Sequence, residues 1–451
     1  MGTTMAEEAR IDVKTLFQKA AGDLSAPELY ELARIAESGP WFGMPVARST
    51  EQVRRPNFEW PLVSEHPYLG KYGKGTAAVY LGNGHERLVR PMIFADGFNY
   101  GPSNLDDLWQ WFNAPYSEAG EQLFDQLLAA GIDIVLLGFD TRHDYVQVNA
   151  GVVRACLAKV IAERQGNAKL ITGGVSMGGL ITRYALAAME ADGDNHDTET
   201  YLSWDSPHNG AWVPLILQQM AHFFEIFEAA NPLKASKAAL LRSPAAQQLL
   251  YAWVEDSRYS GPVATASPLR TQFVEELTAL GGFPSQPVKL GVANGRGDGR
   301  GLGHTPGEIV FEKKFLGGLA GSATARFQPA FGTQRPIGGM HLGLTVRTST
   351  TSAVAPFDGA PGGTLDSFGQ VAGTLGIELE EAKRWGCFVP TISAVGLTFD
   401  PLTWPVELDK DLRGLKPEDT ALNEFCCDTA NSEHSAVTPT LAEWVLRKIA
   451  K

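Results

Sequence analysis

The chain has 451 residues, a hydrophobic share of 44%, a charged share of 20% and a net charge of −13 at pH 7. This size and composition are ordinary for a soluble globular enzyme with one large domain or a few smaller ones. The acidic balance argues against nucleic acid and anionic membranes as the main partners. No run approaches the roughly 18 apolar residues of a transmembrane segment, and the N-terminus lacks the apolar stretch of a signal peptide. We therefore expect a cytoplasmic protein without a membrane span.

The four cysteines are too few for a disulfide framework in a chain of this length, and their spacing matches no zinc site. We expect Cys156, Cys387, Cys426 and Cys427 to be small buried apolar residues. A redox role of the adjacent Cys426 and Cys427 stays open as the alternative. No cluster of potential ligands has the spacing of a zinc or calcium site, so we expect no metal and no cofactor.

The pattern over residues 1–74 predicts helices and loops, with helical periodicity at 28–36. From about residue 75, apolar runs typical of strands alternate with helical repeats, and the connections are short. This alternation is typical of a parallel sheet with helices on both faces. The predicted elements are strands at 76–82, 86–97, 132–139, 169–175 and 200–205, and helices at 104–112, 121–131, 148–166 and 178–190.

After residue 205 this alternation stops. Residues 211–280 have only helical patterns, and a strand follows at 288–294. A stretch rich in Gly, Thr and Phe then predicts antiparallel strands, and residues 387–395 are a candidate last strand, although Pro390 weakens it. Thr438 and Pro439 open an amphipathic C-terminal helix. The predicted organisation is an N-terminal extension of helices and loops (1–74), a first core part (75–210), a helical insertion (211–285), a core strand with a loop (286–300), a β-rich insertion (301–385) and a C-terminal core part (386–451).

Residues 174–178 read Gly-Val-Ser-Met-Gly, a G-x-S-x-G motif. Chance matches are common in a chain with 48 glycines, so the context has to support the motif. An apolar strand precedes it and an apolar helix follows it, as a nucleophile elbow requires. Glycine at 174 and 178 avoids collisions between side chains in so sharp a turn. The turn lifts the hydroxyl of Ser176 above the carboxyl edge of the sheet. The N-terminus of the next helix favours negative charge developing there.

Three further stretches support a resemblance. Residues 91–101 (PMIFADGFNYG) resemble a strand and oxyanion loop that usually carry His-Gly. Residues 203–211 (SWDSPHNGA) resemble the TPHxG stretch after the sixth strand of many bacterial lipases, and residues 431–439 (NSEHSAVTP) resemble the segment with the catalytic histidine. With the elbow, the chain resembles the α/β-hydrolase superfamily in its bacterial lipase and serine-esterase branch.

The resemblance implies an α/β-hydrolase fold, with a mostly parallel central sheet, helices on both faces, a helical lid insertion and a β-rich insertion before the last strand. It also implies a Ser-His-Asp triad in the chain order serine, acid, histidine. Ser176 is then the nucleophile, and His434 is the base because no other histidine lies between the last plausible strand and the last helix. For the acid, Asp298 follows the strand after the helical insertion, where the family usually places it. Asp205, at the tip of its strand, is the alternative.

The oxyanion donors implied by the resemblance are the backbone N–H groups of Met177 and Phe98. Asp96 stands where the family usually has histidine, and it either orients the loop or touches the substrate. The candidates for the substrate pocket are Asp96, Gly97, Asp205, His208, Trp212, Phe223 and Phe224.

These residues predict a serine hydrolase that cleaves a carboxylic ester, small or lipid-like, through an acyl-enzyme. Two alternatives stay open. One is another acyl transfer on the same triad, in a peptidase, thioesterase or acyltransferase, and the other is a ligand-binding protein without catalysis. We interpret the helical insertion as a lid over Ser176. The apolar stripe of its first helix, with Met220 and Phe223, predicts an apolar pocket.

Overall fold

The computed structural model describes residues 42, 53–225, 236–315, 321–332, 334–342, 345–351, 354–398 and 408–450. The predicted helix at 28–36 and most of the N-terminal extension lie outside these residues. Within the described part of the chain, no helix is long and apolar enough to cross a membrane.

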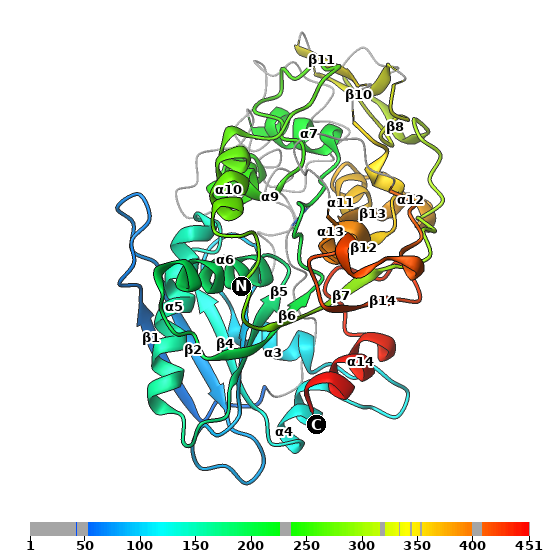
Figure 1. Cartoon of the computed structure of the whole chain (residues 1–451). Helices are drawn as coiled ribbons and strands as arrows, with labels where there is room; N and C mark the ends of the chain where they lie inside the picture. The colour runs from blue at the N-terminus through cyan, green and yellow to red at the C-terminus, as the bar shows by residue number, and fades with distance from the viewer. Residues whose placement is uncertain are drawn as a thin grey trace, which may run out of the picture.

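The centre of the molecule is an eight-stranded sheet in the order β1-β2-β4-β3-β5-β6-β7-β14 (Figure 1). Strand β2 is antiparallel to β1 and to β4, and the neighbours from β4 to β14 are parallel. The strands are β1 (Phe58–Val63), β2 (Lys74–Tyr80), β3 (Pro91–Ala95), β4 (Asp133–Phe139), β5 (Leu170–Val175), β6 (Thr198–Trp204), β7 (Val288–Arg296) and β14 (Glu424–Asp428).

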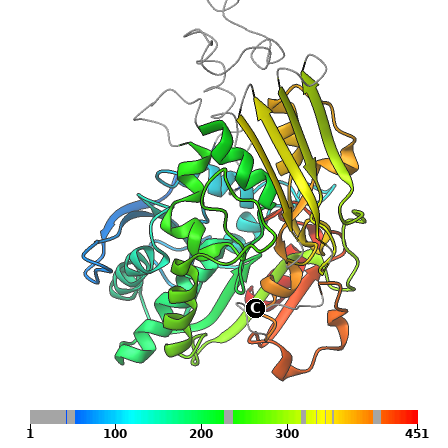
Figure 2. The same cartoon turned by 90° about the horizontal axis from the view of Figure 1, so that it is seen from above.

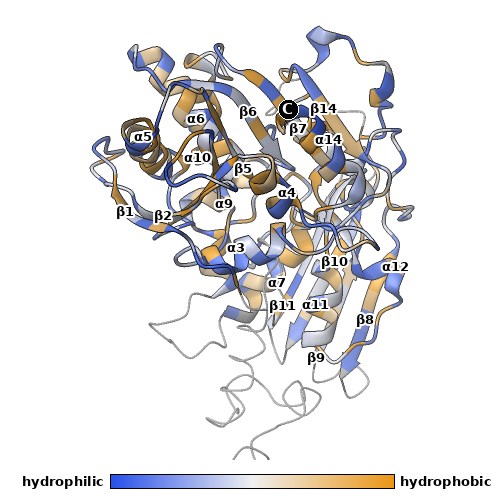
Figure 3. Cartoon of the chain, turned by 90° about the horizontal axis from the view of Figure 1, so that it is seen from below, coloured by the Kyte–Doolittle hydropathy of each residue, from blue (hydrophilic) through white to orange (hydrophobic). Residues whose placement is uncertain are grey.

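Helices cover both faces of this sheet. Helices α5 (Val146–Glu163) and α6 (Met177–Asp192) pack on one face, and α3 (Leu105–Phe112), α4 (Leu123–Ala129) and α14 (Pro439–Ile449) pack on the other. Apolar residues of α5 and α6 are visible in Figure 3. Successive strand residues point to opposite faces, so β4 contributes to both apolar clusters. This mostly parallel sheet with helices on both faces fits an α/β-hydrolase fold, as the motifs implied.

Two parts of this sheet differ from the sequence prediction. Residues 58–63, which we expected in a region of helices and loops, form the edge strand β1, and an edge strand tolerates its Pro61 because one side makes no ladder bonds. The last strand of the central sheet is β14, whereas residues 386–390 form a strand that pairs outside this sheet. The chain therefore leaves the central sheet at the end of β7 and returns to it at the start of β14.

The segments between β6 and β7 and between β7 and β14 form further layers at one end of the sheet, which we call the cap (Figure 1). Its helix α7 packs against strand β10 of a four-stranded antiparallel sheet, as Figure 2 shows. Serine caps and prolines in the first turn start α9 and α10.

The bounds of the cap elements follow from the structure. The helices are α7 (Leu215–Glu225), α8 (Lys237–Leu241), α9 (Pro244–Leu249), α10 (Pro268–Ala279), α11 (Ser367–Thr374), α12 (Glu381–Arg384) and α13 (Thr391–Ala394). The strands are β8 (Ile309–Phe315), β9 (Gly321–Arg326), β10 (Arg335–Leu342) and β11 (Thr345–Thr351), with β12 (Gly362–Leu365) and β13 (Gly386–Pro390) as a separate antiparallel pair.

Candidate active site

The turn between β5 and α6 has the geometry of a nucleophile elbow. Ser176 has a φ of 53° and a ψ of −127°, a conformation that costs energy for any residue other than glycine. A Cβ atom on residue 178 would lie 2.2 Å from the carbonyl oxygen of Ala95, and one on residue 174 would lie 2.6 Å from the same oxygen. Only glycine fits at these two positions, because β3 runs directly beside the turn.

His434 and Asp205 complete a hydrogen-bonded chain that begins at Ser176. The Nε2 atom of His434 lies 2.8 Å from Ser176 Oγ, and its Nδ1 atom lies 2.7 Å from Asp205 Oδ2. The three residues are far apart in the sequence and are at most 3% exposed. All three side chains are therefore buried.

The loop after β14 places His434, and the β12–β13 pair holds this loop. The backbone N–H of His434 donates to Thr364 O at 2.8 Å, and the N–H of Thr364 donates to Ser432 O at 2.9 Å. The ring of Phe388 in β13 meets the His434 ring edge to face, with centroids 4.9 Å apart. Thus the β12–β13 pair, in addition to the central sheet, holds the imidazole in place.

Asp205 follows directly on β6, next to the strand that leads into Ser176. Its backbone N–H donates to Val292 O at 2.8 Å, and its Oδ1 atom accepts from the N–H of Asn294 at 3.0 Å. With Oδ1 bound to β7, Oδ2 is left to accept from His434. A Cβ atom on residue 363 would lie 2.0 Å from Oδ2, so β12 reaches this carboxylate only because Gly363 has no side chain.

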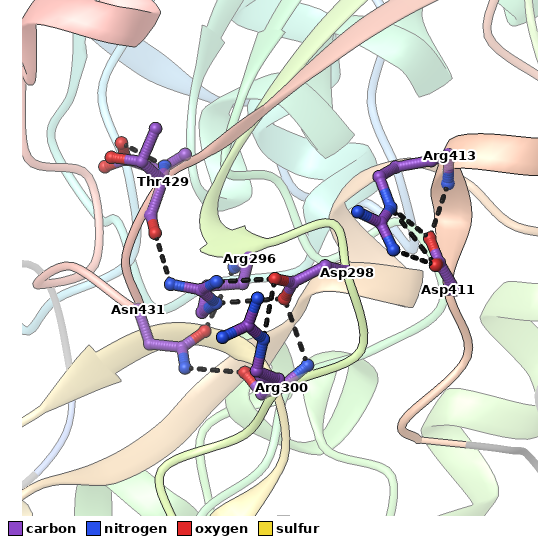
Figure 4. Close-up of polar contacts among 8 residues, drawn as sticks. Arg296, Asp298, Arg300, Asp411, Arg413, Thr429 and Asn431 are labelled. Atoms are coloured by element: carbon purple, nitrogen blue, oxygen red, sulfur yellow. Dashed lines mark hydrogen bonds and ion pairs between the residues drawn. The ribbon is translucent and has the colours of Figure 1, made fainter.

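The expectation that Asp298 holds His434 is not met. Figure 4 shows Asp298 with two arginines, and its carboxylate accepts from Arg296 Nε at 2.9 Å and from Arg300 Nε at 2.9 Å. These hydrogen bonds, first of all that from Arg296, hold the pKa of Asp298 well below its ordinary value. The turn after β7 binds the carboxylate locally, while Asp205 lies at the imidazole. The arginines two residues before and after Asp298 were the sequence signal for this local ion pairing.

The loop after β3 is the predicted oxyanion loop, and it lies against the elbow. A Cβ atom on Gly178 would lie 2.6 Å from Asp96 O. In the described part of the chain, no protein acceptor is seen for the N–H of Phe98 or of Met177. The N–H of Gly97 is used internally, since it donates to Asp96 Oδ1 at 2.8 Å. Burial raises the pKa of Asp96, and the charge of Arg142 opposes this rise.

Two predicted pocket residues, His208 and Trp212, make hydrogen bonds within the protein. His208 lies 3.0 Å from Ser203 Oγ through Nε2, and Arg183 donates to its carbonyl at 3.1 Å. Trp212 Nε1 donates to Asp358 Oδ1 at 2.6 Å, inside the cap. Burial raises the pKa of this Asp358 carboxyl to about 6.

The remaining predicted residues are placed as follows. Phe223 is fully buried in α7, and the side chain of Phe224 lies outside what the structure describes. Cys426 and Cys427, in β14, are free thiols. Burial raises the pKa of both, that of Cys426 to about 11, which makes them poor nucleophiles. Within the described ranges, no three His, Cys, Asp or Glu side chains are grouped as metal ligands.

A cavity of about 440 Å³ lies at the ends of β7 and β14. It is lined by residues of the turn around Asp298, by Leu412 and Arg413, and by residues of β14 and its C-terminal end. Neither Ser176 nor His434 lines it. The lining residues are Arg296, Gly297, Asp298, Leu412, Arg413, Phe425, Cys426, Cys427, Asp428 and Thr429.

No protein-family model and no curated protein matches the sequence. Among solved structures, the Pyrobaculum calidifontis esterase aligns over 63% of this chain and 75% of its own length, at 11% identity and a TM-score of 0.30. The mature Bacillus licheniformis lipase BlEst2 aligns over 48% of this chain and 71% of its own, at 15% identity and a TM-score of 0.27. Est1E from Butyrivibrio proteoclasticus aligns over 32% of this chain and about half, 51%, of its own, at 14% identity and a TM-score of 0.23.

These matched proteins are esterases and a lipase. In its sheet order and its elbow, the chain resembles the α/β-hydrolase superfamily.

Proposed function

We propose that this protein is a serine hydrolase that cleaves a carboxylic ester through an acyl-enzyme. The observation that carries the proposal is the pair of hydrogen bonds that links Ser176 to His434 and His434 to Asp205. The strained turn at Ser176 supports it, because backbone strain of this kind persists where the surrounding structure requires it and is concentrated at functional sites.

In the proposed reaction, Ser176 Oγ attacks the acyl carbon while His434 Nε2 takes its proton. Asp205 accepts the Nδ1–H of His434, which fixes the tautomer and stabilises the imidazolium. The N–H groups of Met177 and Phe98 donate to the oxyanion of the tetrahedral intermediate. His434 passes the proton to the leaving alcohol, and water then attacks the acyl-enzyme with His434 again as the base.

The environment of the site supports an apolar substrate group. Phe388 packs on the imidazole, and Phe98 and Met177 are buried beside the elbow. Ser176 is only 3% exposed, which is consistent with a covered nucleophile. We propose that the cap is the lid of this site. The apolar face of its helix α7 also packs on β10, where Ile216 lies against Gly338.

The test is labelling of the purified protein with a fluorophosphonate probe, together with hydrolysis of p-nitrophenyl butyrate. We expect labelling and turnover in the wild type and neither in Ser176→Ala. Matched p-nitroanilide and thioester substrates, with and without an acceptor alcohol, distinguish an esterase from a peptidase, thioesterase or acyltransferase. A wild-type protein that is neither labelled nor active would support the binding-protein alternative and contradict the proposal.

Chain-length dependence tests the apolar pocket. Along a homologous series of p-nitrophenyl esters, kcat/KM should rise while each added methylene is buried, by up to about 0.8 kcal/mol of binding each, and then fall when the pocket is full. The measurement is kcat/KM from acetate to palmitate at substrate concentrations below micelle formation. A flat profile, or a preference for charged or sugar-bearing esters, would contradict an apolar pocket.

A single methyl group on β12 tests whether the position of Asp205 matters. Gly363→Ala places a Cβ atom 2.0 Å from Asp205 Oδ2, so the carboxylate or β12 has to move. We expect kcat to fall by roughly 10- to 1,000-fold, within the range that the loss of triad function allows. The matched control is Gly373→Ala in α11, where a Cβ atom meets nothing within 4 Å.

Both alanine variants are compared by thermal unfolding and by kcat on the same ester. The control should retain activity and stability, because alanine favours a helix more than glycine does. If Gly363→Ala remained folded and kept the kcat of the wild type, Asp205 Oδ2 would not need its observed position.

A further inference from the structure

We propose that Asp96 and Arg142 form a charge pair that positions the oxyanion loop, residues 97–103, for catalysis. This inference rests on the proposed function, since the loop carries the N–H of Phe98. Neither residue has to contact the substrate, so both are positioning residues.

Asp96 binds the start of the oxyanion loop. Its Oδ1 atom accepts from the N–H of Gly97 at 2.8 Å. Asp96 is 3% exposed. The loop is therefore folded around its own buried carboxylate, and a buried charge requires a partner of opposite sign.

Arg142 supplies that partner from the loop after the neighbouring strand β4. Its NH1 atom lies 3.2 Å from Asp96 Oδ2. The same guanidinium is directed at the carbonyls of Gly101 and Tyr100, each at 3.4 Å, and the Arg142 backbone N–H donates to Gly101 O at 3.2 Å. One side chain thus binds both the carboxylate at the start of the loop and the backbone near its end.

This arrangement controls the peptide that would bind the oxyanion. Strand β3 pairs with β5 so that Ala95 lies opposite Gly174, and the loop begins against the elbow. The Gly97 N–H is fixed on Asp96, one peptide unit before the N–H of Phe98. Both carboxylate oxygens of Asp96 are occupied by protein donors, which supports loop orientation over substrate contact.

Asp96→Asn removes the charge and presents an amide that cannot accept from both Gly97 and Arg142. We expect kcat and kcat/KM on p-nitrophenyl butyrate to fall together, by roughly 10- to 100-fold, somewhat less than the 10²–10³ typical of losing one oxyanion donor outright. Arg142→Gln should have a similar effect, and Arg142→Lys should retain part of the activity because the charge remains. The double variant should lose little more than the larger single loss, since the two residues act as a unit.

Inhibition by a trifluoromethyl ketone gives a readout that a general structural defect would not change in the same way. Ser176 Oγ adds to its carbonyl carbon, and the carbonyl oxygen becomes an oxyanion in the proposed hole. Its inhibition constant should rise by about the same factor as kcat/KM falls, because both report on the transition-state geometry. The affinity for the non-reacting alcohol analogue of the same ketone should stay unchanged.

The matched control is the ion pair of Arg164 and Asp197, at 2.7 Å and with side chains 9% and 10% exposed. It is about as buried as the Asp96–Arg142 pair, but Asp197 precedes β6, at the opposite end of the strands from Ser176. Asp197→Asn and Arg164→Gln are expected to lower the melting temperature and to leave kcat per folded molecule unchanged.

The outcomes separate this inference from the proposed function. A wild-type protein without esterase activity would overturn the proposed function before any variant is made. With an active wild type, full ketone affinity and kcat in Asp96→Asn or in the double variant would overturn the inference. Equal loss of activity in the Arg164 and Asp197 variants would do so as well, since the effect would then be general destabilisation. If Asp96→Asn fails to fold, Arg142→Lys and Arg142→Gln carry the test.

Discussion

Ser176→Ala and His434→Ala are each expected to lower kcat by roughly 10⁶-fold on an activated ester, by analogy with the loss of either group in other serine hydrolases. The reason is that Ser176 Oγ forms the bond to the acyl carbon and that His434 Nε2, 2.8 Å away, removes its proton. Because the two groups act as a unit, each single variant should be about as inactive as the double variant.

Single-turnover kinetics with p-nitrophenyl butyrate and labelling by a fluorophosphonate measure this prediction. His66→Ala is the control, because this histidine is exposed and lies outside the site. Circular dichroism establishes that each variant is folded. Near-wild-type turnover in His434→Ala would remove this residue from the role of the base, whatever the hydrogen bond suggests.

Asp205→Asn is expected to lower kcat by about 10⁴-fold, whereas Asp298→Asn should leave it within a few-fold of the wild type. Asparagine at 205 would present an N–H or a poorer acceptor to His434 Nδ1, so the imidazole loses its correct tautomer. Asp298 binds Arg296 and Arg300, and its removal affects a turn after β7.

The two variants are best compared in parallel for kcat and for the melting temperature. Asp298→Asn is the natural control, because it makes the same change at the aspartate that the sequence favoured as the acid. A larger loss of kcat in Asp298→Asn than in Asp205→Asn would restore the assignment made from the sequence and would mean that the Asp205–His434 contact does not operate in catalysis.

Much of the architecture could be predicted from local patterns. The alternation of apolar runs and helical repeats predicted strands β2 to β6 and helices α3 to α6 within three residues of the observed bounds, except that the strand predicted at 86–97 is only the short β3 (Pro91–Ala95). The apolar periodicity of these elements extends over many residues. The capping residues and glycines that end the helices lie within one turn of the helix ends, so the local sequence is enough to locate these elements. The elbow at Ser176 belongs to this group, because the two glycines, the strand and the helix are adjacent in sequence.

The errors occurred where a short segment depends on distant partners. Strand β1 contains Pro61 and forms only because β2 offers an edge. Strand β14 is five residues with two cysteines, and its pairing with β7 decides that it is the last strand of the central sheet. Segments this short have too little periodicity to identify their structure without the partner.

The sequence by itself pointed to Ser176 as the candidate nucleophile, to the histidine segment and to the loop around Asp96, because each carries its own local motif. Only the tertiary structure shows which carboxylate lies at the imidazole, since the sequence left two candidate aspartates, Asp298 and Asp205, and does not encode which one faces His434. That choice follows from packing: β7 binds Asp205 Oδ1, Gly363 lets β12 approach Oδ2, and two arginines hold Asp298 in its own turn. Hydrogen bonds between segments more than 200 residues apart are set by the packing of strands, which local sequence does not encode.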